Sequence, residues 1–121
     1  MTPKQLGSFG ESLAYKKLLS SGYQILERNY RFSKAEVDLI VKKDDILIFV
    51  EVKTRSSSYF GQPEEFVSQN QEQLLFDAAN HYMEQIGHDW EIRFDIISIL
   101  YRNKNNYQLK HLKDAFFPDQ I

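Results

Sequence analysis

The sequence contains no cysteine and no long hydrophobic run. The absence of cysteine excludes structural disulfides and thiolate zinc sites, and it allows a reducing compartment. The longest apolar run, Ile46 to Val50, is too short to cross a bilayer, and the residues from Met1 to Gln5 lack the apolar segment of a signal peptide. We therefore expect a cytoplasmic protein without membrane contact.

A strong net charge is also absent, since the 121 residues carry a formal charge of -2, which argues against a strongly basic nucleic-acid binder. Residues 1–60 carry ten Lys or Arg against seven Asp or Glu, whereas residues 61–121 carry five against ten. This small basic excess fits ordinary surface charge as well as a binding face. With 42% hydrophobic residues, the chain fits one compact domain over residues 1–121.

The stretch 35–53 has the pattern of a β-hairpin. Val and Ile dominate both arms, and the polar residues 42–45 provide a turn. Four charged side chains interrupt the apolar arms: Glu36, Asp38, Glu51 and Lys53. Burial of a charge is costly unless it is paired or bound to a metal, so these four residues are candidates for a functional site.

A two-residue turn at Asp44–Asp45 would determine the register of this hairpin. Lys43 would pair with Ile46, so that paired positions sum to 89. Asp38 would then stand opposite Glu51, and Glu36 opposite Lys53. Cβ atoms of opposed residues lie about 5 Å apart, which would let both carboxylates bind one divalent cation, with the ammonium beside it for an anionic oxygen. A slip of one residue would separate Asp38 and Glu51 onto opposite faces.

The flanking segments predict two helices and further strands. A helix begins at the cap Thr2-Pro3, runs to about Ser20 and ends at Gly22; a second runs from the cap Ser68 to Gly87. Strands are expected over 23–31 and 91–101, with a short last one over 107–112, and a polar loop over 54–63. The order helix, three strands, helix, two strands indicates an α/β fold with a mixed sheet between two helices.

Glu11 lies in a packing stripe of the first helix with Gly7, Ala14 and Leu18. Small residues around it would let the helix approach the sheet and aim the carboxylate inward. Alternatively, Glu11 sits at the edge of the stripe and pairs with Lys4 or Tyr15. On the second helix, the stripe expected to form core consists of Leu75, Ala78, Tyr82 and Ile86.

Asp38 followed by Glu51-Val52-Lys53 resembles the signature of the PD-(D/E)XK nucleases, and Glu11 resembles the extra carboxylate of the archaeal Holliday-junction-resolvase branch. More closely, the chain looks like the YraN-like family of small bacterial proteins, over nearly its whole length. The residues behind this resemblance include Gly10-Glu11, Asn29-Tyr30-Arg31, 36–40, 49–55 and Arg93-Phe94-Asp95. Two positions depart from the family pattern: Ala35 replaces a usual glycine, and Gln71 replaces a common lysine that could contact phosphate.

The resemblance implies a restriction-endonuclease-like αβββαβ core and a metal-dependent DNA endonuclease acting on branched or otherwise structured DNA. Mg²⁺ or Mn²⁺ would be held by Asp38 and Glu51, with Glu11 as third ligand. Lys53 would orient water or stabilise the transition state. Glu36 is a further catalytic candidate of lower rank. A homodimer is also implied, because resolvases of this fold act as dimers. The candidate phosphate contacts are Arg28, Arg31, Lys42, Lys43 and Arg55.

In a second hypothesis, the protein has the nuclease fold but does not catalyse a reaction. Fold alone does not settle function, and the same carboxylates could form an ion-pair network with Lys53 and Arg55 in a nucleic-acid-binding or protein-interaction module. Binding of a divalent metal at Asp38 and Glu51 separates the two hypotheses.

Overall fold

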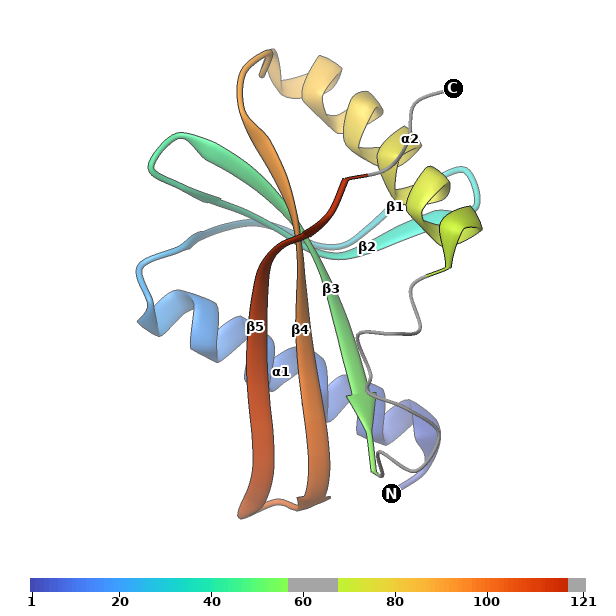
Figure 1. Cartoon of the computed structure of the whole chain (residues 1–121), viewed down its shortest axis with the longest axis vertical. Coiled ribbons are helices and arrows are strands. Elements are labelled where there is room, and N and C mark those ends of the chain that lie inside the picture. Colours follow the sequence, from blue (N-terminus) through green and yellow to red (C-terminus); the bar gives the residue numbers. More distant parts are fainter. Residues whose placement is uncertain (57–67, 118–121) are drawn as a thin grey trace.

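A computed structural model describes residues 1–56 and 68–117, and Figure 1 shows their arrangement. The element order confirms the expected helix, three strands, helix and two strands. The elements are α1 (Pro3–Ser20), β1 (Gln24–Phe32), β2 (Ala35–Lys43), β3 (Ile46–Arg55), α2 (Gln69–Ile86), β4 (Ile92–Asn103) and β5 (Asn106–Phe116).

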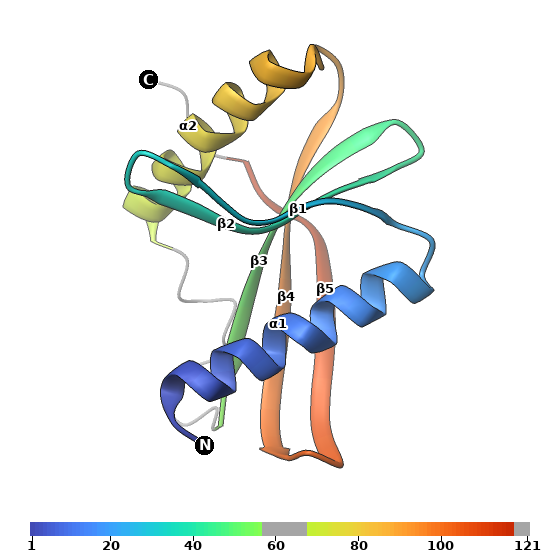
Figure 2. The ribbon, with the colours of Figure 1, turned by 180° about the vertical axis from the view of Figure 1, so that it is seen from behind.

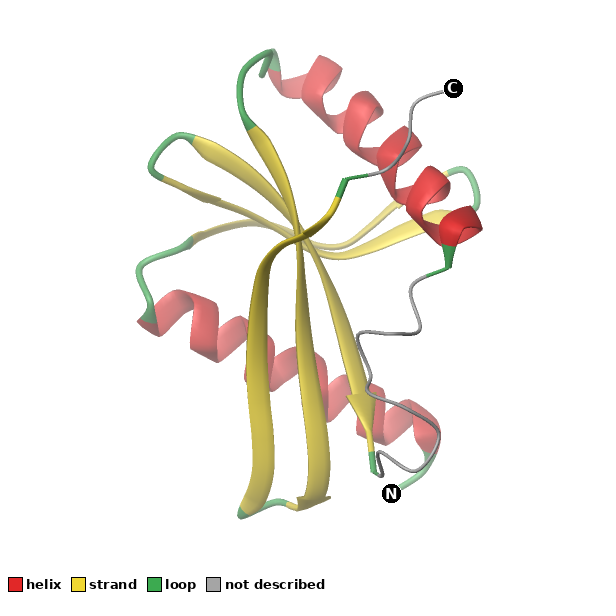
Figure 3. Cartoon of the chain, in the orientation of Figure 1, coloured by secondary structure: helices red, strands yellow, loops and turns green. Residues whose placement is uncertain are grey.

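The strands form one mixed sheet in the order β1-β2-β3-β4-β5. The β3–β4 pair is parallel and the other three pairs are antiparallel. Helix α2 covers one face and α1 the other, as the front and back views show (Figures 1 and 2). Figure 3 distinguishes the two helices from the strands between them. The expected sheet between two helices is therefore confirmed.

Several strand boundaries differ from the sequence-based expectation, most clearly those of β3 and β5. Strand β3 continues to Arg55, so the polar loop expected from residue 54 begins later, and its residues 57–63 lie outside the described part. The last strand spans Asn106–Phe116 rather than 107–112. Strands β4 and β5 form one long antiparallel pair. Its ladder of backbone hydrogen bonds extends over polar residues whose sequence alone does not predict a strand.

Both helices begin at the expected caps. Thr2 Oγ1 accepts a hydrogen bond from the Gln5 amide, the Gln5 side chain accepts one from the Thr2 amide, and Pro3 opens the helix. Ser68 caps α2, which ends at Gly87 in the left-handed conformation (φ 68°). Neither helix is long and apolar enough to cross a bilayer.

The turn between β2 and β3 has the predicted geometry. Asp44 and Asp45 both have positive φ (52° and 65°), as a two-residue hairpin turn of this hand requires. The pairs run from Lys43↔Ile46 to Leu39↔Val50, so positions sum to 89 throughout. As far as Leu39↔Val50 this register is the one expected from the sequence, but the expected pairs Asp38–Glu51 and Glu36–Lys53 are not part of the ladder.

Two apolar cores lie on opposite faces of the sheet. On the α2 side, Phe49 and Phe94 are fully buried with Leu75 and Ala78 of the helix, and on the α1 side Val50 and Ile97 pack with Ala14 and Leu18. Contrary to expectation, Ile86 does not belong to the core. It is 46% exposed, because it ends α2 beside Trp90, which is itself half exposed.

Strand β2 leaves β3 at Asp38, and we call this point the fork. The ladder between the two strands ends at Leu39↔Val50. Val37 packs in the α2-side core and Leu39 in the α1-side core, although regular alternation would place them on one face. Asn29, which lies on β1 between the partners of these residues, has a positive φ of 53°. Figure 1 shows β3 running away from β1 and β2 beyond this point.

Candidate metal centre

Two carboxylates meet in the fork. Asp38 Oδ2 accepts a hydrogen bond of 2.7 Å from the Val52 amide, so the Asp38 side chain continues the ladder where the backbone of β2 has left it. Glu51 is 5% exposed and interacts directly with Asp38. Within the described residues, Glu51 Oε1 is the buried side-chain oxygen without a hydrogen-bond partner. The fork therefore contains a buried carboxylate oxygen for which the described residues supply no hydrogen bond.

The carboxylates of Asp38 and Glu51 are electrostatically unfavourable neighbours when both are charged. Burial, together with the nearby Asp38 charge, raises the pKa of Glu51 to about 9, although Lys53 opposes the shift. Burial also raises the pKa of Asp38, against the lowering effect of the Val52 hydrogen bond. At neutral pH the metal-free pair therefore retains a proton, which a divalent cation would replace.

Gln71 connects this pair to Lys53. Its side-chain nitrogen donates to Glu51 Oε2 (3.3 Å), and its side-chain oxygen accepts from Lys53 Nζ (3.4 Å). Gln71 lies in the first turn of α2, so the start of this helix reaches the site. This bridge was not predicted, because Gln71 was noted only as a replacement of a lysine and the sequence carries no signal for which strand the start of α2 will meet.

Glu11 approaches the fork from α1. In the orientation that satisfies its neighbours, the Asn29 side-chain nitrogen donates to Glu11 Oε1 and Glu36 Oε1, each at 3.1 Å. Burial raises the pKa of Glu11, and the charges of Asp38 and Glu36 add to this effect. The carboxylate is thus turned inward, as expected. The role of Asn29 was missed, although its positive φ is one that asparagine tolerates well.

The close approach of α1 occurs at Gly10. A Cβ at this position would overlap Thr54 Oγ1 of β3, whereas a Cβ on Gly7 would meet nothing within 4 Å. Gly7 therefore does not provide the close contact that the sequence stripe assigned to it.

Glu36 does not stand opposite Lys53, which corrects the expected pairing. It forms an ion pair with Arg31 across the β1–β2 ladder, with Arg31 Nη2 3.3 Å from Glu36 Oε2. The reason is the fork itself, because β2 no longer runs beside β3 at this position.

The expected phosphate-binding cations are dispersed. Lys42 and Lys43 lie at the turn end of the hairpin, where Lys42 pairs with Asp45 (3.7 Å) and Lys43 donates to Ser21 O (2.9 Å). Arg28 covers the Tyr15 ring near Glu11. Arg55 lines a hollow of about 440 Å³ together with Glu11 and Lys53, so it lies closest to the expected role.

The donor set fits a hard, hydrated cation. Across residues 1–56 and 68–117, no group of three or more His, Asp or Glu side chains is arranged to hold a metal. The carboxylates that meet in the fork are those of Asp38 and Glu51, and Glu11 is hydrogen-bonded to Asn29. Mg²⁺ commonly keeps several waters and binds through one or two carboxylates together with substrate phosphates, and carboxylates suit Mn²⁺ as well.

Comparison with known proteins gives matches over almost the full length. Residues 10–99 match the model of a family described as "Uncharacterised protein family UPF0102". A UPF0102 protein of Christiangramia forsetii is 50% identical over 113 residues, which cover 93% of this chain and 94% of the relative. One of Natranaerobius thermophilus is 47% identical over 119 residues, covering 96% of this chain and all of the relative.

Proposed function

The chain belongs to the uncharacterised protein family UPF0102, and we propose from the geometry of its fork that it is a divalent-metal-dependent endonuclease of DNA. The single observation that supports the proposal is Glu51 Oε1, a buried oxygen to which no described residue gives a hydrogen bond, placed beside the carboxylate of Asp38. An unsatisfied buried polar atom costs free energy, and such an atom needs a reason. A cation held by Asp38 and Glu51 supplies one.

The residues divide the work of phosphodiester hydrolysis. Asp38 and Glu51 would hold Mg²⁺ or Mn²⁺, which when bound lowers the pKa of a coordinated water and neutralises phosphate charge. Lys53 cannot ligate a cation as an ammonium; it donates hydrogen bonds to the attacking water or to a phosphate oxygen. Gln71 holds Lys53 and Glu51 in their mutual positions. Water would attack phosphorus and lose a proton to solvent, while the bond to the leaving sugar oxygen breaks and that oxygen takes up a proton.

The first test measures metal binding and cleavage separately. Calorimetry with Mn²⁺ should show one site that Glu51→Gln removes. Cleavage should be assayed on linear, single-stranded, flapped and four-way DNA with Mg²⁺ or Mn²⁺, and a chelator should abolish it. Lys53→Ala should lose turnover while keeping most of the metal affinity, and Lys16→Ala, an exposed lysine of α1, serves as the control.

A metal site with no cleavage of any substrate would contradict the enzymatic part of the proposal. Absence of metal binding at Asp38 and Glu51 would favour the second candidate, a nucleic-acid-binding or protein-interaction module without turnover. The hydrogen bonds from Gln71 to Glu51 and from Lys53 to Gln71 support this candidate, because they show part of the site satisfied within the chain.

A further inference from the structure

Strands β4 and β5 extend away from α2 as a ribbon of positive charge (Figure 1). Residues 96–103 of β4 and 106–112 of β5 contain no Asp or Glu but include Arg102 and Lys110, and Lys104 lies in the turn between the strands. Residues 61–121 as a whole carry five Lys or Arg against ten Asp or Glu. The ribbon is therefore a local concentration of cations in the acidic half of the chain.

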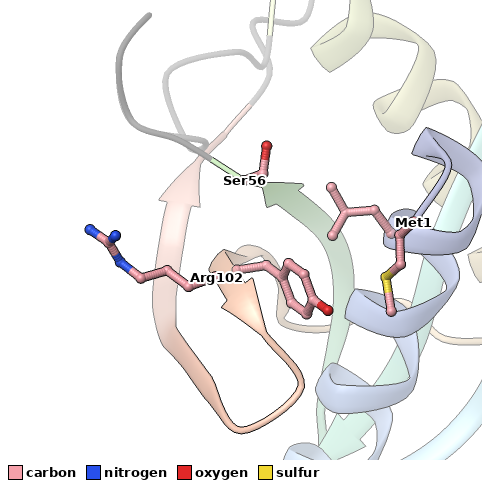
Figure 4. A pocket seen from close by; sticks show the side chains of 5 residues that line it. Met1, Ser56 and Arg102 are labelled. Atoms are coloured by element: carbon pink, nitrogen blue, oxygen red, sulfur yellow. The ribbon is translucent and has the colours of Figure 1, made fainter.

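The register of the sheet places these cations on the same face as Lys53. Directly paired residues share a face, and so do residues two apart along one strand. Lys53 of β3 pairs with Ser98 of β4, which in turn pairs with Lys110 of β5. Arg102 lies four residues after Ser98 and belongs to this face as well. Figure 4 agrees, because it shows the Arg102 side chain directed away from Met1 at the start of α1.

This face of the sheet is the one that α2 approaches. Lys53 Nζ donates to Gln71 Oε1 in the first turn of α2, at 3.4 Å. The helix packs mainly on β1 and β2, however, and neither helix of the described chain lies in front of the far ends of β4 and β5 in Figure 1. Arg102 and Lys110 are both exposed. We call the surface that the cations of β3, β4 and β5 form on this side the basic face; it consists of Lys53, Arg55, Arg102 and Lys110.

The basic face offers no aromatic ring on which a base could stack. In residues 52–55, 96–103 and 106–112, the only Phe, Tyr or Trp side chains are those of Tyr101 and Tyr107. Both contact Phe9 of α1 on the opposite side of the sheet, with ring centroids 5.2 and 6.2 Å from that of Phe9. Single strands are commonly held by stacking of their bases, whereas contacts to phosphates alone suffice to hold a duplex. The basic face therefore fits the backbone of a duplex.

The spacing of the cations also fits a duplex. Lys53 and Lys110 lie in one row two strands apart, which corresponds to about 10 Å between their Cα atoms, and Arg102 lies about 13 Å from that row along β4. The phosphates of B-DNA border grooves about 6 and 12 Å wide. The cations are thus spaced on the scale at which a duplex presents the phosphates of its two strands.

We propose that the basic face binds the backbone of a DNA duplex beside the metal centre, with Arg102 and Lys110 on phosphates other than the one that reacts. The inference rests on the proposed nuclease function and specifies a double-stranded segment in its substrate. Lys53 connects the two regions, because Gln71 joins it to Glu51 and it begins the basic face. Contacts to phosphates carry no sequence information, so binding should not depend on sequence.

The first test uses fluorescence anisotropy in EDTA, so that no cleavage occurs. A labelled DNA duplex should bind more tightly than a labelled dT strand of the same length, and two duplexes of unrelated sequence should bind equally. Arg102→Glu should weaken duplex binding and make the log–log dependence on salt shallower by about one unit. The matched control Lys16→Glu reverses the same charge on the exposed side of α1 and should change neither quantity.

A second pair of variants adds charge. Gln108 is exposed on β5 and lies in the same row as Arg55, through Leu100 of β4. Gln108→Lys should tighten duplex binding and steepen the salt dependence by about 0.9 unit of slope. Ser12→Lys adds the same charge at an exposed position of α1 and should have no effect. Because unfolding cannot produce a gain in affinity, this pair decides the question even if Arg102→Glu unfolds.

The proposal fails if the dT strand binds as tightly as the duplex, or if either variant of the basic face behaves like its control on α1. The cations of β4 and β5 would then serve only to keep the edge of the sheet from pairing with another chain. Metal binding and cleavage decide the nuclease separately. Duplex binding that depends on Arg102, without metal binding at Asp38 and Glu51, would refute the metal centre alone.

Discussion

Two buried carboxylates of this chain have opposite environments. Asp95 is fully buried and saturated: Arg93 donates two hydrogen bonds, His111 shares one of 2.7 Å, and the Asp114 amide donates another. Burial alone would raise the pKa of Asp95, but these bonds bring it below the ordinary value. Glu51 is nearly as buried and keeps one oxygen unpartnered. We interpret Asp95 as structural and Glu51 as functional.

Glu51 should make the metal-free protein less stable at high pH. Its pKa is raised from 4.5 to about 9 in the fold, so its contribution to stability is fully present below 4.5 and is lost as the pH rises through about 9. Glu51→Gln removes this titration. The unfolding free energy of Glu51→Gln minus that of wild type should therefore increase with pH, by at most about 1.4 kcal/mol per pH unit.

Urea unfolding in EDTA between pH 6 and pH 9 measures this difference. Glu84→Gln, at an exposed position of α2, should follow wild type at every pH. Parallel pH profiles for Glu51→Gln and wild type would contradict the raised pKa of Glu51.

Gln71 should matter for metal affinity although it is not a ligand. Gln71→Ala releases Glu51 Oε2 and Lys53 Nζ. Loss of a residue that orients a metal ligand typically costs about 10–100-fold in metal affinity or activity. Calorimetry with Mn²⁺ measures the effect, with Gln69→Ala, exposed two residues earlier, as the control. Unchanged affinity in both variants would show that Glu51 is oriented without Gln71.

At the scale of elements, the site depends on how closely α1 lies on β3. Gly10 packs against Thr54, one residue before the helix presents Glu11 to Asn29. At this contact a larger side chain would lift the helix from the strand. The distance between the two elements thus decides whether the carboxylate of α1 reaches the fork.

Gly10→Ala should destabilise the protein by about 1–3 kcal/mol, because its Cβ would overlap Thr54 Oγ1 in a packed interface. Gly7→Ala is the matched control on the same helix. Its Cβ meets open space, and helix propensity should stabilise the protein by up to about 1 kcal/mol. Thermal or urea unfolding measures both; equal changes of the same sign would contradict the close contact.

The pair β4–β5 is held together by the cluster around Asp95. Asp95→Asn should lower the unfolding free energy by about 3 kcal/mol at pH 7, since it leaves Arg93, whose side chain is 18% exposed, without its counter-charge. Asp95 stabilises the fold at pH values above the pKa that it has in the unfolded chain. This stabilisation is lost as the pH falls through the lower pKa that Asp95 has in the folded protein. Asp89→Asn, at an exposed position, should leave the unfolding free energy nearly unchanged in urea titrations.

At the scale of the whole molecule, the net charge says little about the charge near the metal centre. The chain carries a net charge of -2, but Lys53 and Arg55 lie on β3 and line, with Glu11, a hollow of about 440 Å³. Lys42 and Lys43 lie at the other end of β3. Binding of nucleic acid would therefore depend on a short local stripe of charge.

Salt dependence should report the length of this stripe. If Lys53 and Arg55 each meet a phosphate, the logarithm of the affinity for a single strand should fall with the logarithm of salt concentration with a slope of about -1.4. Turnover-deficient Glu51→Gln should show the same slope. Anisotropy titrations across a range of salt concentrations measure it, and a slope near zero would exclude phosphate contacts by this stripe.

Much of the fold follows from local patterns in the sequence. The caps Thr2 and Ser68 determine where both helices begin, and the turn Asp44–Asp45 determines the register of the central hairpin. Because side chains alternate with a period of two along a strand, Glu51 and Lys53 share one face of β3. These features depend on residues close in the chain, which is why the sequence predicts them.

The composition of the site was decided by the tertiary structure. The ladder of β2 and β3 ends at Leu39↔Val50, so Glu36 turns to Arg31 and the fork opens around Asp38 and Glu51. Gln71 and Asn29 reach the carboxylates from an element far along the chain and from a neighbouring strand. Strand divergence and helix placement come from packing two cores on opposite faces of one sheet, and such long-range contacts have no period in the sequence.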